Sequence, residues 1–349
     1  MNVLMVGVHH KRMGGMWTVA ASYIENQKYN QNIKLTYIPT ITSGTIVQRS
    51  LFMLNGYRKI LWRFWTKEVD IVHVHMAEKG STFRKGLIVK LWRKKNKKII
   101  IHLHAGPFMA WYSVQNPRIQ KYIQSILNDA SKICVLGEYW KNQLSSIVNP
   151  QIISVLYNGI KCPEKNPYNE NGKNIIYLGV MCKNKGIYDL INAIESIDTN
   201  IEPTIKVQLC GIDLEGDVAD IIQMKNLNER IEMMGWIDEK TREKVFRNAI
   251  LMVLPSYFEG LSMAVLEAMA HGVPVITTNI STMPELLGES ISLVEPGNCD
   301  QLSRYIFDLI ENKNERKRMS RIEFERVRNL FSEETFINKT LDIYNECFK

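Results

Sequence analysis

Short apolar runs alternate with segments of helical periodicity along the whole chain. In the first half, the runs with the length and content of buried strands are residues 3–8, 70–75, 98–104, 130–136 and 152–156. In the second half, they are residues 174–179, 205–210, 231–234, 249–254 and 273–277. Because buried strands that alternate with helices form parallel sheets, the pattern predicts two doubly wound α/β halves.

A polar segment at residues 161–173 (KCPEKNPYNENGK) separates the two halves. Its Pro, Gly and Asn residues are typical of an interdomain linker. Helical periodicity returns from residue 299 to the end of the chain. We therefore expect a first domain of residues 1–165 and a second domain of residues 166–330, followed by a helical C-terminal segment of residues 331–349.

The most informative stretch is residues 255–276, PSYFEGLSMAVLEAMAHGVPVI. It follows a strand of the buried type, turns at Glu259 and Gly260, and has the pattern of a helix from Ser262 to residue 270. Free backbone N–H groups and the positive end of the dipole make the start of such a helix an anion site. Glu267, between one and two turns into the helix, could accept hydrogen bonds from hydroxyls beside a bound phosphate. The stretch therefore predicts a phosphate site flanked by sugar.

The composition is that of a folded protein with two differently charged halves. The 349 residues are 45% hydrophobic and 23% charged, which argues against disorder. Residues 1–169 hold 24 Lys and Arg against 7 Asp and Glu, a net charge of +17. Residues 170–349 hold 20 against 29, a net charge of −9. The basic half therefore favours an anionic partner, which could be a lipid headgroup, a diphosphate or a nucleic acid.

Two segments of the basic half combine tryptophan with Lys and Arg: residues 61–67 (LWRFWTK) and residues 90–98 (KLWRKKNKK). This mixture suits the surface of an anionic membrane. The alternative is a solvated helix face with one buried Trp. Because no nucleic-acid-binding motif accompanies the charge, we expect no nucleic-acid partner.

Targeting signals and cysteine usage bear on the compartment. We expect no secretory signal, because the short apolar start is followed at once by basic residues, and no membrane span, because no run approaches 18 apolar residues. The six cysteines show neither a disulfide framework nor zinc-site spacing, which fits a reducing compartment. We therefore expect a cytoplasmic protein that lies peripherally at the inner face of the plasma membrane.

Several segments, taken in order, resemble motifs of retaining glycosyltransferase family 4. They are the glycine loop at residues 13–15, the histidine-containing strand ends at 70–75 and 102–104, the turn at 157–160, the loop at 178–186, the pair Glu259 and Glu267, and the final stretch 331–344. The resemblance covers essentially the whole chain, and the paired glutamates are its most specific part. It implies the GT-B fold, in which two Rossmann-like doubly wound domains face a central cleft. It also implies that the C-terminal helix, residues 331–349, crosses back to pack on the N-terminal domain.

The resemblance implies roles for individual residues. Glu267 would accept hydrogen bonds from the hydroxyls of the donor ribose. Glu259 and His104 would contact the transferred sugar as the catalytic residues. The remaining residues of the donor nucleotide-sugar site would be Gly15, in a turn where the backbone can approach a ligand, and, at the diphosphate, Lys185, Gly260, Leu261 and Ser262. No metal site is expected, because no pair of carboxylates of the DxD type stands at a strand end.

One position departs from the family's pattern. The family usually has an arginine directly after the glycine at position 179, and here that residue is Val180. The arginine and Lys185 would together neutralise the donor diphosphate. Lys183, in the same loop, could supply the missing charge.

The reaction implied by the resemblance is a metal-independent transfer of a hexosyl group with retention of configuration. The second domain would bind a nucleotide-diphosphate-sugar, a UDP-sugar in preference to a GDP-sugar, and the first domain would bind the acceptor. We expect the acceptor hydroxyl on a lipid-linked saccharide of bacterial surface polysaccharide synthesis. It would attack the anomeric carbon of the sugar on the same face from which the diphosphate leaves. No cofactor would be needed.

Other functions stay open at this point. The paired glutamates could be the acid and the nucleophile of a glycosidase, although that reaction needs two carboxylates that converge on one bond. A sugar-nucleotide epimerase of the same architecture would bind a nucleotide and need no acceptor. A catalytically weakened saccharide-binding or scaffold subunit would fit the replacement of arginine by Val180.

Overall fold

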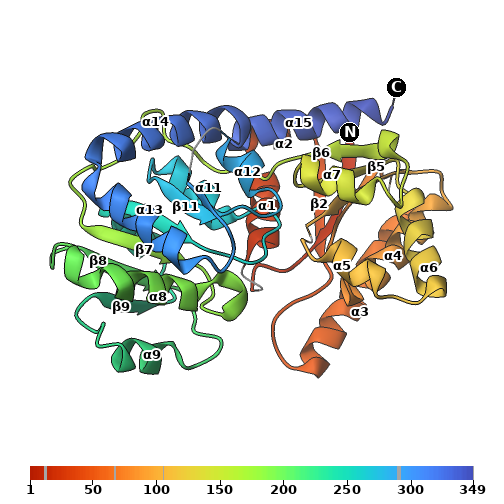
Figure 1. The fold of residues 1–349 in the computed structure, drawn as a ribbon. Helices are drawn as coiled ribbons and strands as arrows, with labels where there is room; N and C mark the ends of the chain where they lie inside the picture. The colour runs from red at the N-terminus through yellow and green to blue at the C-terminus, as the bar shows by residue number, and fades with distance from the viewer. Residues whose placement is uncertain (12–13, 67, 105, 289–291, 349) are drawn as a thin grey trace. The chain divides into compact units, whose positions relative to one another are not determined.

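The computed structural model describes residues 1–349 except residues 12–13, 67, 105, 289–291 and 349. By its internal contacts the chain divides into two units (Figure 1). Unit 1 comprises Met1–Gly159 together with Glu333–Lys349, and unit 2 comprises Ile160–Ser332. The C-terminal segment therefore belongs to the same unit as the N-terminus.

Unit 1 is built on one parallel sheet with the strand order β2-β1-β3-β4-β5-β6. The strands are β1 (Asn2–Gly7), β2 (Lys34–Pro39), β3 (Ile71–Met76), β4 (Lys98–Leu103), β5 (Lys132–Val135) and β6 (Ile153–Val155). All six residues of β3 are buried, including its two histidines. A continuous buried run of this kind is typical of a central strand that is covered on both faces.

Eight helices of the described residues surround this sheet. They are α1 (Gly15–Glu25), α2 (Gln27–Asn32), α3 (Ile46–Thr66), α4 (Gly80–Arg93), α5 (Phe108–Ser113), α6 (Pro117–Asn128), α7 (Glu138–Leu144) and α15 (Glu333–Glu346). A single 3₁₀ turn, η1 (Pro150–Ile152), precedes β6. Within the part of the chain that the structure describes, no helix has both the length and the apolar character needed to cross a bilayer.

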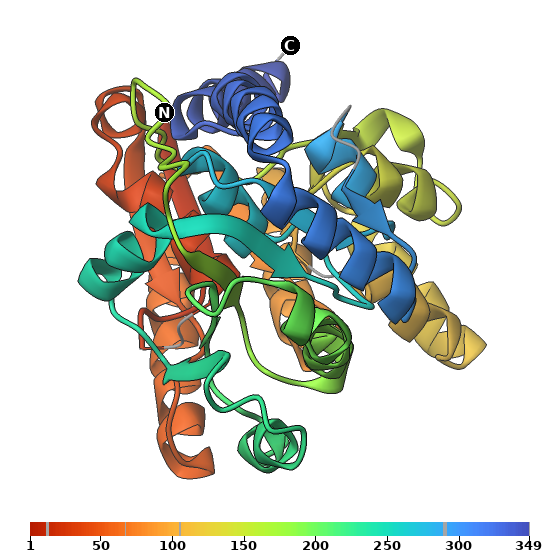
Figure 2. The ribbon, with the colours of Figure 1, turned by 60° about the vertical axis from the view of Figure 1, so that its left-hand side comes forward.

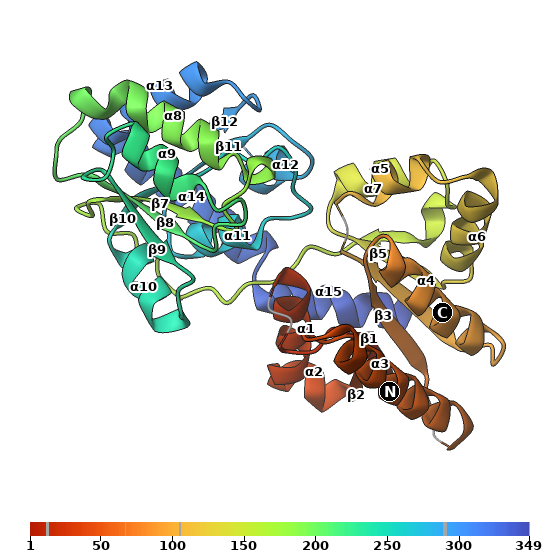
Figure 3. The same cartoon turned by 90° about the horizontal axis from the view of Figure 1, so that it is seen from below.

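The C-terminal helix α15 completes the core of unit 1. Its Phe336 and Tyr344 belong to the same buried cluster as Tyr23 and Tyr29. The Tyr344 hydroxyl lies 2.6 Å from Nδ1 of His73 and 3.0 Å from the hydroxyl of Tyr29. Figure 3 shows α15 running alongside α1, α2 and the first strands. The implied return of the C-terminal helix to the N-terminal half is confirmed.

Unit 2 is built on a second parallel sheet with the strand order β12-β11-β10-β7-β8-β9. The strands are β7 (Asn174–Leu178), β8 (Lys206–Cys210), β9 (Ile231–Gly235), β10 (Ala249–Leu254), β11 (Val275–Thr278) and β12 (Leu293–Val294). The six residues of β10 are all buried, as their uninterrupted apolar run predicts.

The helices of unit 2 cover both faces of its sheet. They are α8 (Ile187–Ile197), α9 (Val218–Met224), α10 (Glu239–Arg247), α11 (Met263–Ala270), α12 (Met283–Leu287), α13 (Cys299–Glu311) and α14 (Lys313–Leu330), with the 3₁₀ turns η2 (Lys183–Lys185) and η3 (Asp198–Asn200). Helices α8 and α13 pack against each other (Figure 2). Helix α14 packs on α11.

The polar segment 161–173 lies on unit 2 and is held there by hydrogen bonds. The Asn166 amide donates to the hydroxyl of Ser320 (2.9 Å), and the Tyr168 hydroxyl donates to the carbonyl of Ile250 (3.0 Å). Both partners are distant in the sequence, so composition could not reveal them. The segment has the irregular backbone of a linker, but it is part of a domain.

The predicted α/β class with two doubly wound parallel sheets is confirmed. Each predicted apolar run contains a strand, and the strand ends differ by no more than two residues from the predicted ends. The strands β2 and β12 were not predicted, and both lie at a sheet edge. An edge strand buries less of its surface: β2 is only partly buried along most of its length. It therefore lacks the continuous apolar run that marks the central strands.

The variant Tyr344→Phe tests how much α15 contributes to unit 1. It keeps the ring but removes the hydroxyl, so the buried His73 and Tyr29 each lose a partner. We expect the free energy of unfolding of unit 1 to fall by about 1–3 kcal/mol. Urea unfolding followed by tryptophan fluorescence measures this, because six of the seven tryptophans lie in unit 1. The control is Tyr139→Phe at an exposed position of the same unit. If both variants lose the same free energy of unfolding, the buried hydrogen bonds of Tyr344 do not stabilise unit 1.

Candidate functional site

The order of the strands in unit 2 places a ligand crevice between β7 and β10. The chain leaves β7 towards β8 on one side, whereas β10 is followed by β11 on the other side. The loops that follow these two neighbouring strands therefore diverge, which opens a crevice at the carboxyl ends of the strands. The loop after β7 carries Lys185, and the loop after β10 carries Glu259.

Gly186 allows these two loops to approach each other. Its φ of 69° is in the left-handed region that favours glycine. A Cβ atom at this position would lie 2.0 Å from the carbonyl oxygen of Pro255, so any larger residue would push the loops apart. The amide of Tyr257 donates to the carbonyl of Asn184 at 2.9 Å and joins the loops a second time. The backbone thus holds Lys185 and Glu259 within reach of each other.

Lys185 and Glu259 form an ion pair. The distance from Nζ of Lys185 to Oε1 of Glu259 is 2.6 Å, and the hydroxyl of Ser256 donates to the same oxygen at 2.8 Å. Glu259 is only 6% exposed and Ser256 is fully buried, whereas Lys185 is partly exposed. Two donors therefore satisfy the buried carboxylate of Glu259. The pair fixes the ammonium group at the surface of the crevice.

Helix α11 begins at Met263, four residues beyond Glu259, and ends at residue 270, which confirms the predicted helix. The Ser262 side chain caps it by accepting a hydrogen bond from the amide of Val265. Leu261 is buried, and the carbonyl of Gly260 accepts a hydrogen bond from Thr282 at 2.6 Å. The turn at residues 260–262 is therefore rigidly held, with the helix N-terminus just behind it.

Glu267 lies on α11 beside an arginine that the sequence did not point to. Its Oε2 is 3.3 Å from the guanidinium of Arg242 in α10. Burial raises the pKa of Glu267, while the nearby Arg242 and His271 lower it. Among the described residues, Oε2 is buried and accepts no hydrogen bond. The contact of Oε2 is the ion pair with Arg242, and its hydrogen-bonding capacity is not used within the described structure.

Val180 is an exposed apolar residue in the loop after β7. It is 43% exposed, and its carbonyl accepts a hydrogen bond from the Tyr177 hydroxyl at 2.8 Å. The cations of this loop are Lys183 and Lys185, which share the 3₁₀ turn η2. Lys183 is exposed. The loop therefore presents two lysines, and no arginine, on the way from β7 to α8.

Unit 1 carries the other two predicted site residues, His104 and Gly15. His104 follows β4, where its amide donates to the carbonyl of Met76 at 2.8 Å. Its Nε2 lies 2.7 Å from Nδ1 of His75. Gly15 is the first residue of α1 and follows Gly14, whose φ of 136° favours glycine. The structure therefore places six of the predicted residues in unit 2 and two in unit 1.

Four histidines form a stack in unit 1. His73, His75 and His102 are fully buried, and His104 lies at the end of the stack. Burial lowers the pKa of every one of them, to about 3 for His73 and His104. These side chains are therefore neutral near pH 7. His104 can donate or accept a hydrogen bond but does not carry a charge.

The same stack holds the group of potential metal ligands found among the described residues. The ligand nitrogens of His73, His75 and His102 lie within 4.8 Å of one another. Tetrahedral zinc with bonds of about 2.0 Å needs nitrogens roughly 3.3 Å apart. The rings of His73 and His75 instead stack at 12°, and the ammonium of the buried Lys85 donates to the His75 carbonyl. The geometry is that of a packed core and not of a metal centre.

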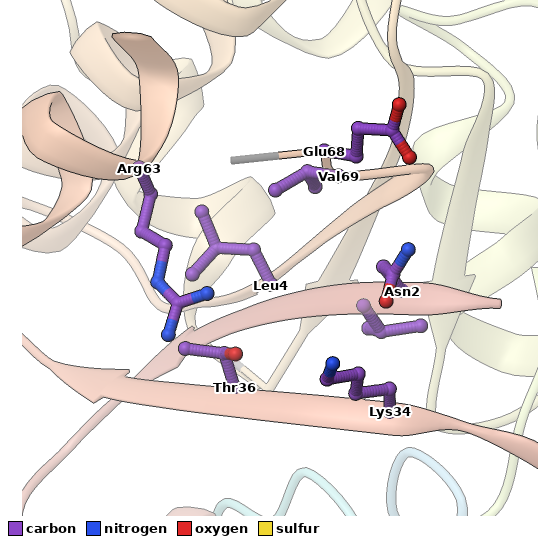
Figure 4. Close-up of a pocket in the computed structure, with 8 residues that line it drawn as sticks. Asn2, Leu4, Lys34, Thr36, Arg63, Glu68 and Val69 are labelled. Atoms are coloured by element: carbon purple, nitrogen blue, oxygen red, sulfur yellow. The ribbon is translucent and has the colours of Figure 1, made fainter. Parts of the chain in front are cut away.

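A hollow of about 270 Å³ lies elsewhere in unit 1, at the amino-terminal ends of β1 and β2. Figure 4 shows its lining, with Arg63 reaching from α3 towards Thr36. Ligands of open parallel sheets bind at the opposite, carboxyl ends of the strands. This hollow is therefore not a candidate for the donor or the acceptor.

Comparison with known proteins matches both halves of the chain to family models. Residues 161–326 match the model for glycosyl transferases group 1, and residues 18–162 match the model for glycosyltransferase family 4. The "Uncharacterized 41.2 kDa protein in cps region" of Klebsiella pneumoniae is 24% identical over 99% of each chain. The capsular polysaccharide biosynthesis glycosyltransferase CapM of Staphylococcus aureus is 26% identical over 66% of this chain and 59% of its own.

A solved structure shares the fold. The Anabaena protein HepE, in complex with UDP, has a TM-score of 0.76 at 14% identity, covering 99% of this chain and 100% of that one. The expected GT-B fold is thereby confirmed.

We predict that unit 1 loses stability in mild acid, because its buried histidines are neutral in the folded state. Their pKa values are lower in the folded chain than the value of about 6.5 in the unfolded chain, so the unfolded chain binds more protons below pH 6.5. The stabilisation is complete above pH 6.5 and is lost as the pH falls towards 3. Each fully buried histidine contributes a slope of up to about 1.4 kcal/mol per pH unit.

The variant His102→Leu tests this dependence, because both nitrogens of His102 are buried without a hydrogen-bond partner in the described structure. We expect unchanged or greater stability at pH 7.5 and a shallower loss between pH 6.5 and 5, measured by urea unfolding. His10→Leu, at an exposed position, should leave the pH slope as it is in the wild type. If the pH dependence of stability in His102→Leu equals that of the wild type, protonation of the buried His102 is not a cause of the loss of stability in acid.

Proposed function

We propose a reaction for this chain from the premise that it belongs to glycosyltransferase family 4 and is a glycosyltransferase of the GT-B fold. It moves a sugar from a nucleotide-diphosphate-sugar to a hydroxyl of a saccharide, with retention of configuration and without a metal. The preferred donor is a UDP-sugar. The enzyme acts in the synthesis of a bacterial surface polysaccharide.

One observation carries the proposal. At the crevice between β7 and β10, a cation, a buried carboxylate and a helix N-terminus come together, and Glu267 lies further along the same helix with an oxygen that accepts no hydrogen bond in the described structure. These groups match the parts of a nucleoside diphosphate: Lys185 and the amides of residues 260–262 face the phosphates, and Glu267 accepts from the ribose hydroxyls. Burial raises the pKa of Glu267, and the nearby guanidinium of Arg242 opposes that rise.

The chemistry follows from this charge distribution. The bond between the anomeric carbon and the diphosphate oxygen breaks, and the acceptor oxygen bonds to the same face of that carbon. The acceptor proton passes to the departing phosphate oxygen, so no separate base is required. Lys185 and the positive end of α11 stabilise the charge that develops on the diphosphate. Glu259 orients the transferred sugar through its hydroxyls, and the neutral His104 is a hydrogen-bonding group of unit 1 that suits a sugar hydroxyl.

The acceptor is a saccharide that we expect to be lipid-linked. The relatives include a capsular polysaccharide glycosyltransferase and a protein of a cps region. The first 169 residues carry a net charge of +17, which suits the anionic inner face of the plasma membrane. In this setting unit 1 would receive the acceptor, and unit 2 would hold the donor.

A thermal-shift panel of UDP, GDP, ADP and CMP, each with and without EDTA, tests the donor assignment. A ligand that binds the folded state raises the melting temperature. At a ligand concentration of a hundred times Kd, the free energy of unfolding rises by about 2.7 kcal/mol. We expect UDP to give the largest shift and the shift to persist in EDTA. If no nucleotide stabilises the protein, the donor assignment is wrong and a scaffold function would replace it.

The variant Glu267→Ala tests the ribose contact. Loss of hydrogen bonds to a charged acceptor should weaken UDP binding by about ten- to a hundredfold, measured by isothermal titration. The control is Glu311→Ala, at an exposed position at the end of α13 in the same unit, which should bind UDP like the wild type. Equal affinity of Glu267→Ala and the wild type would remove Glu267 from the site.

The variant Val180→Arg tests the position at which the family's usual arginine is missing. Val180 is exposed, so an arginine can be accommodated without disturbing the core. A second cation at the diphosphate should tighten UDP binding by about tenfold. Met224→Arg adds the same charge on α9 and serves as the control. If the two variants bind UDP equally well, other groups already fill the place of the arginine.

A further inference from the structure

Helix α3 exposes a row of large apolar side chains. Val47 (66%), Leu51 (62%), Leu54 (61%) and Trp65 (75%) are among the most exposed apolar residues of the chain, and Trp62 is 53% exposed. Scattered exposed apolar residues are normal on a folded protein, but a contiguous row marks an interaction surface. Figure 1 shows the N-terminal end of α3 projecting from the rest of unit 1.

The exposed residues form a stripe along the helix. Positions 47, 51, 54, 61 and 65 fall within about 80° of one another at 100° per residue and extend over roughly 27 Å. The opposite side carries Gly56, Ile60 and Phe64, which are buried in unit 1. Helix α3 is therefore apolar on two sides: one side packs on its own domain, and the other faces outwards. We call the outward row, together with Trp62, the α3 stripe.

The charges on helix α3 itself are all of one sign. Residues 46–66 contain four Lys or Arg and no Asp or Glu. Arg58 falls within the stripe, and Lys59 lies next to it, both exposed. Arg63, in contrast, lines the hollow at the start of β1 and β2 (Figure 4). The partner of the stripe must therefore accept both apolar side chains and cations.

Cations flank both ends of the stripe, and the exposed Glu68 follows α3 at its C-terminal end. At the C-terminal end, the ammonium of Lys95 lies 5.2 Å from the ring centre of Trp65, in the exposed turn that follows α4. At the N-terminal end, a hollow of about 260 Å³ is lined by Arg49 and Arg84 together with Ile46 and Met53. A hollow with two guanidinium groups and apolar walls suits a phosphate-bearing headgroup.

We propose that α3 lies in the surface of an anionic lipid bilayer, with the α3 stripe at the depth of the headgroups and upper acyl chains. Tryptophan and leucine side chains enter that layer, and Arg58 and Lys59 reach the phosphates. A second copy of the chain is a poorer occupant. It would bring the same cations opposite Arg58, and residues 46–66 of that copy have no acid to pair with them.

This inference corrects one of the two sequence-based membrane segments. Trp92, in the segment 90–98, is only 1% exposed and packs edge-on against Phe64. That segment therefore offers cations but no aromatic anchor. The other segment, 61–67, is the end of a much longer surface: its Trp62 and Trp65 are exposed, and the stripe continues to Val47. Lys67 lies outside the described residues.

Flotation with phosphatidylcholine vesicles, with and without phosphatidylglycerol, tests the proposal on the full chain. We expect the wild type to float with the anionic vesicles. The triple variant Leu51→Ser, Leu54→Ser, Trp65→Ser should lose at least about tenfold in vesicle affinity. The matched control, Val114→Ser, Leu214→Ser, Met224→Ser, removes equally exposed apolar side chains elsewhere and should bind like the wild type. Equal binding of the two triple variants would overturn the proposal.

Brominated lipids distinguish insertion from attraction by charge alone. They should quench the fluorescence of the bound wild type, and Trp62→Phe, Trp65→Phe should lose most of the quenching while still floating. If the wild type is a dimer that ignores vesicles and the stripe variant is a monomer, the stripe is a self-association surface and the proposal fails.

The donor site is monitored separately in the same variants. Helix α3 lies in unit 1, and the donor residues lie in unit 2. The thermal shift with UDP should therefore be the same in the wild type and in the triple variant of the stripe. A failure of vesicle binding with an intact UDP shift would reject the membrane surface alone, whereas a missing UDP shift in the wild type would reject the proposed donor.

Discussion

The close approach of two loops at the carboxyl ends of β7 and β10 is the constraint on which the candidate donor site depends. Gly186 leaves room for the carbonyl of Pro255, and the ion pair between Lys185 and Glu259 closes the contact. Lys185 and Glu259 are 74 residues apart in the sequence, yet both follow strands that are neighbours in the sheet. The topology of the sheet brings Lys185 and Glu259 to the same edge, and Gly186 allows the two loops to come close enough for the ion pair to form.

Unit 1 repeats this plan with different chemistry. The strand order of its sheet also reverses direction, between β1 and β3. The loop after β1 leads to Gly15, and β3 carries His75, which lies beside His104. Where unit 2 offers charged groups, unit 1 offers imidazoles that burial keeps neutral. Neutral imidazoles at the end of a sheet suit hydrogen bonds to hydroxyls, and charged groups at the end of a sheet suit a diphosphate. This difference supports the proposal that unit 1 binds a neutral saccharide and unit 2 binds a nucleotide.

The sequence predicts what depends on local pattern and misses what depends on tertiary contact. Central strands such as β10 are continuous apolar runs, and the helix after Ser262 has a cap and a closing glycine, so both could be predicted. The edge strand β2 lacks such a run. Arg242 could not be linked to Glu267, because the two meet only when α10 packs near α11. The stripe on α3 has ordinary helical periodicity, and only the structure shows that a second apolar side faces outwards.

The most direct test of the central claim is hydrogen–deuterium exchange of the full chain with and without saturating UDP. Binding should slow exchange in peptides that cover residues 183–187 and residues 260–265, because the amides of the two loops become hydrogen-bonded or shielded. Peptides from α9 in the same unit should exchange as before. Protection confined to unit 1, or no protection under conditions in which the enzyme transfers sugar from a UDP-sugar, would contradict a donor site between β7 and β10.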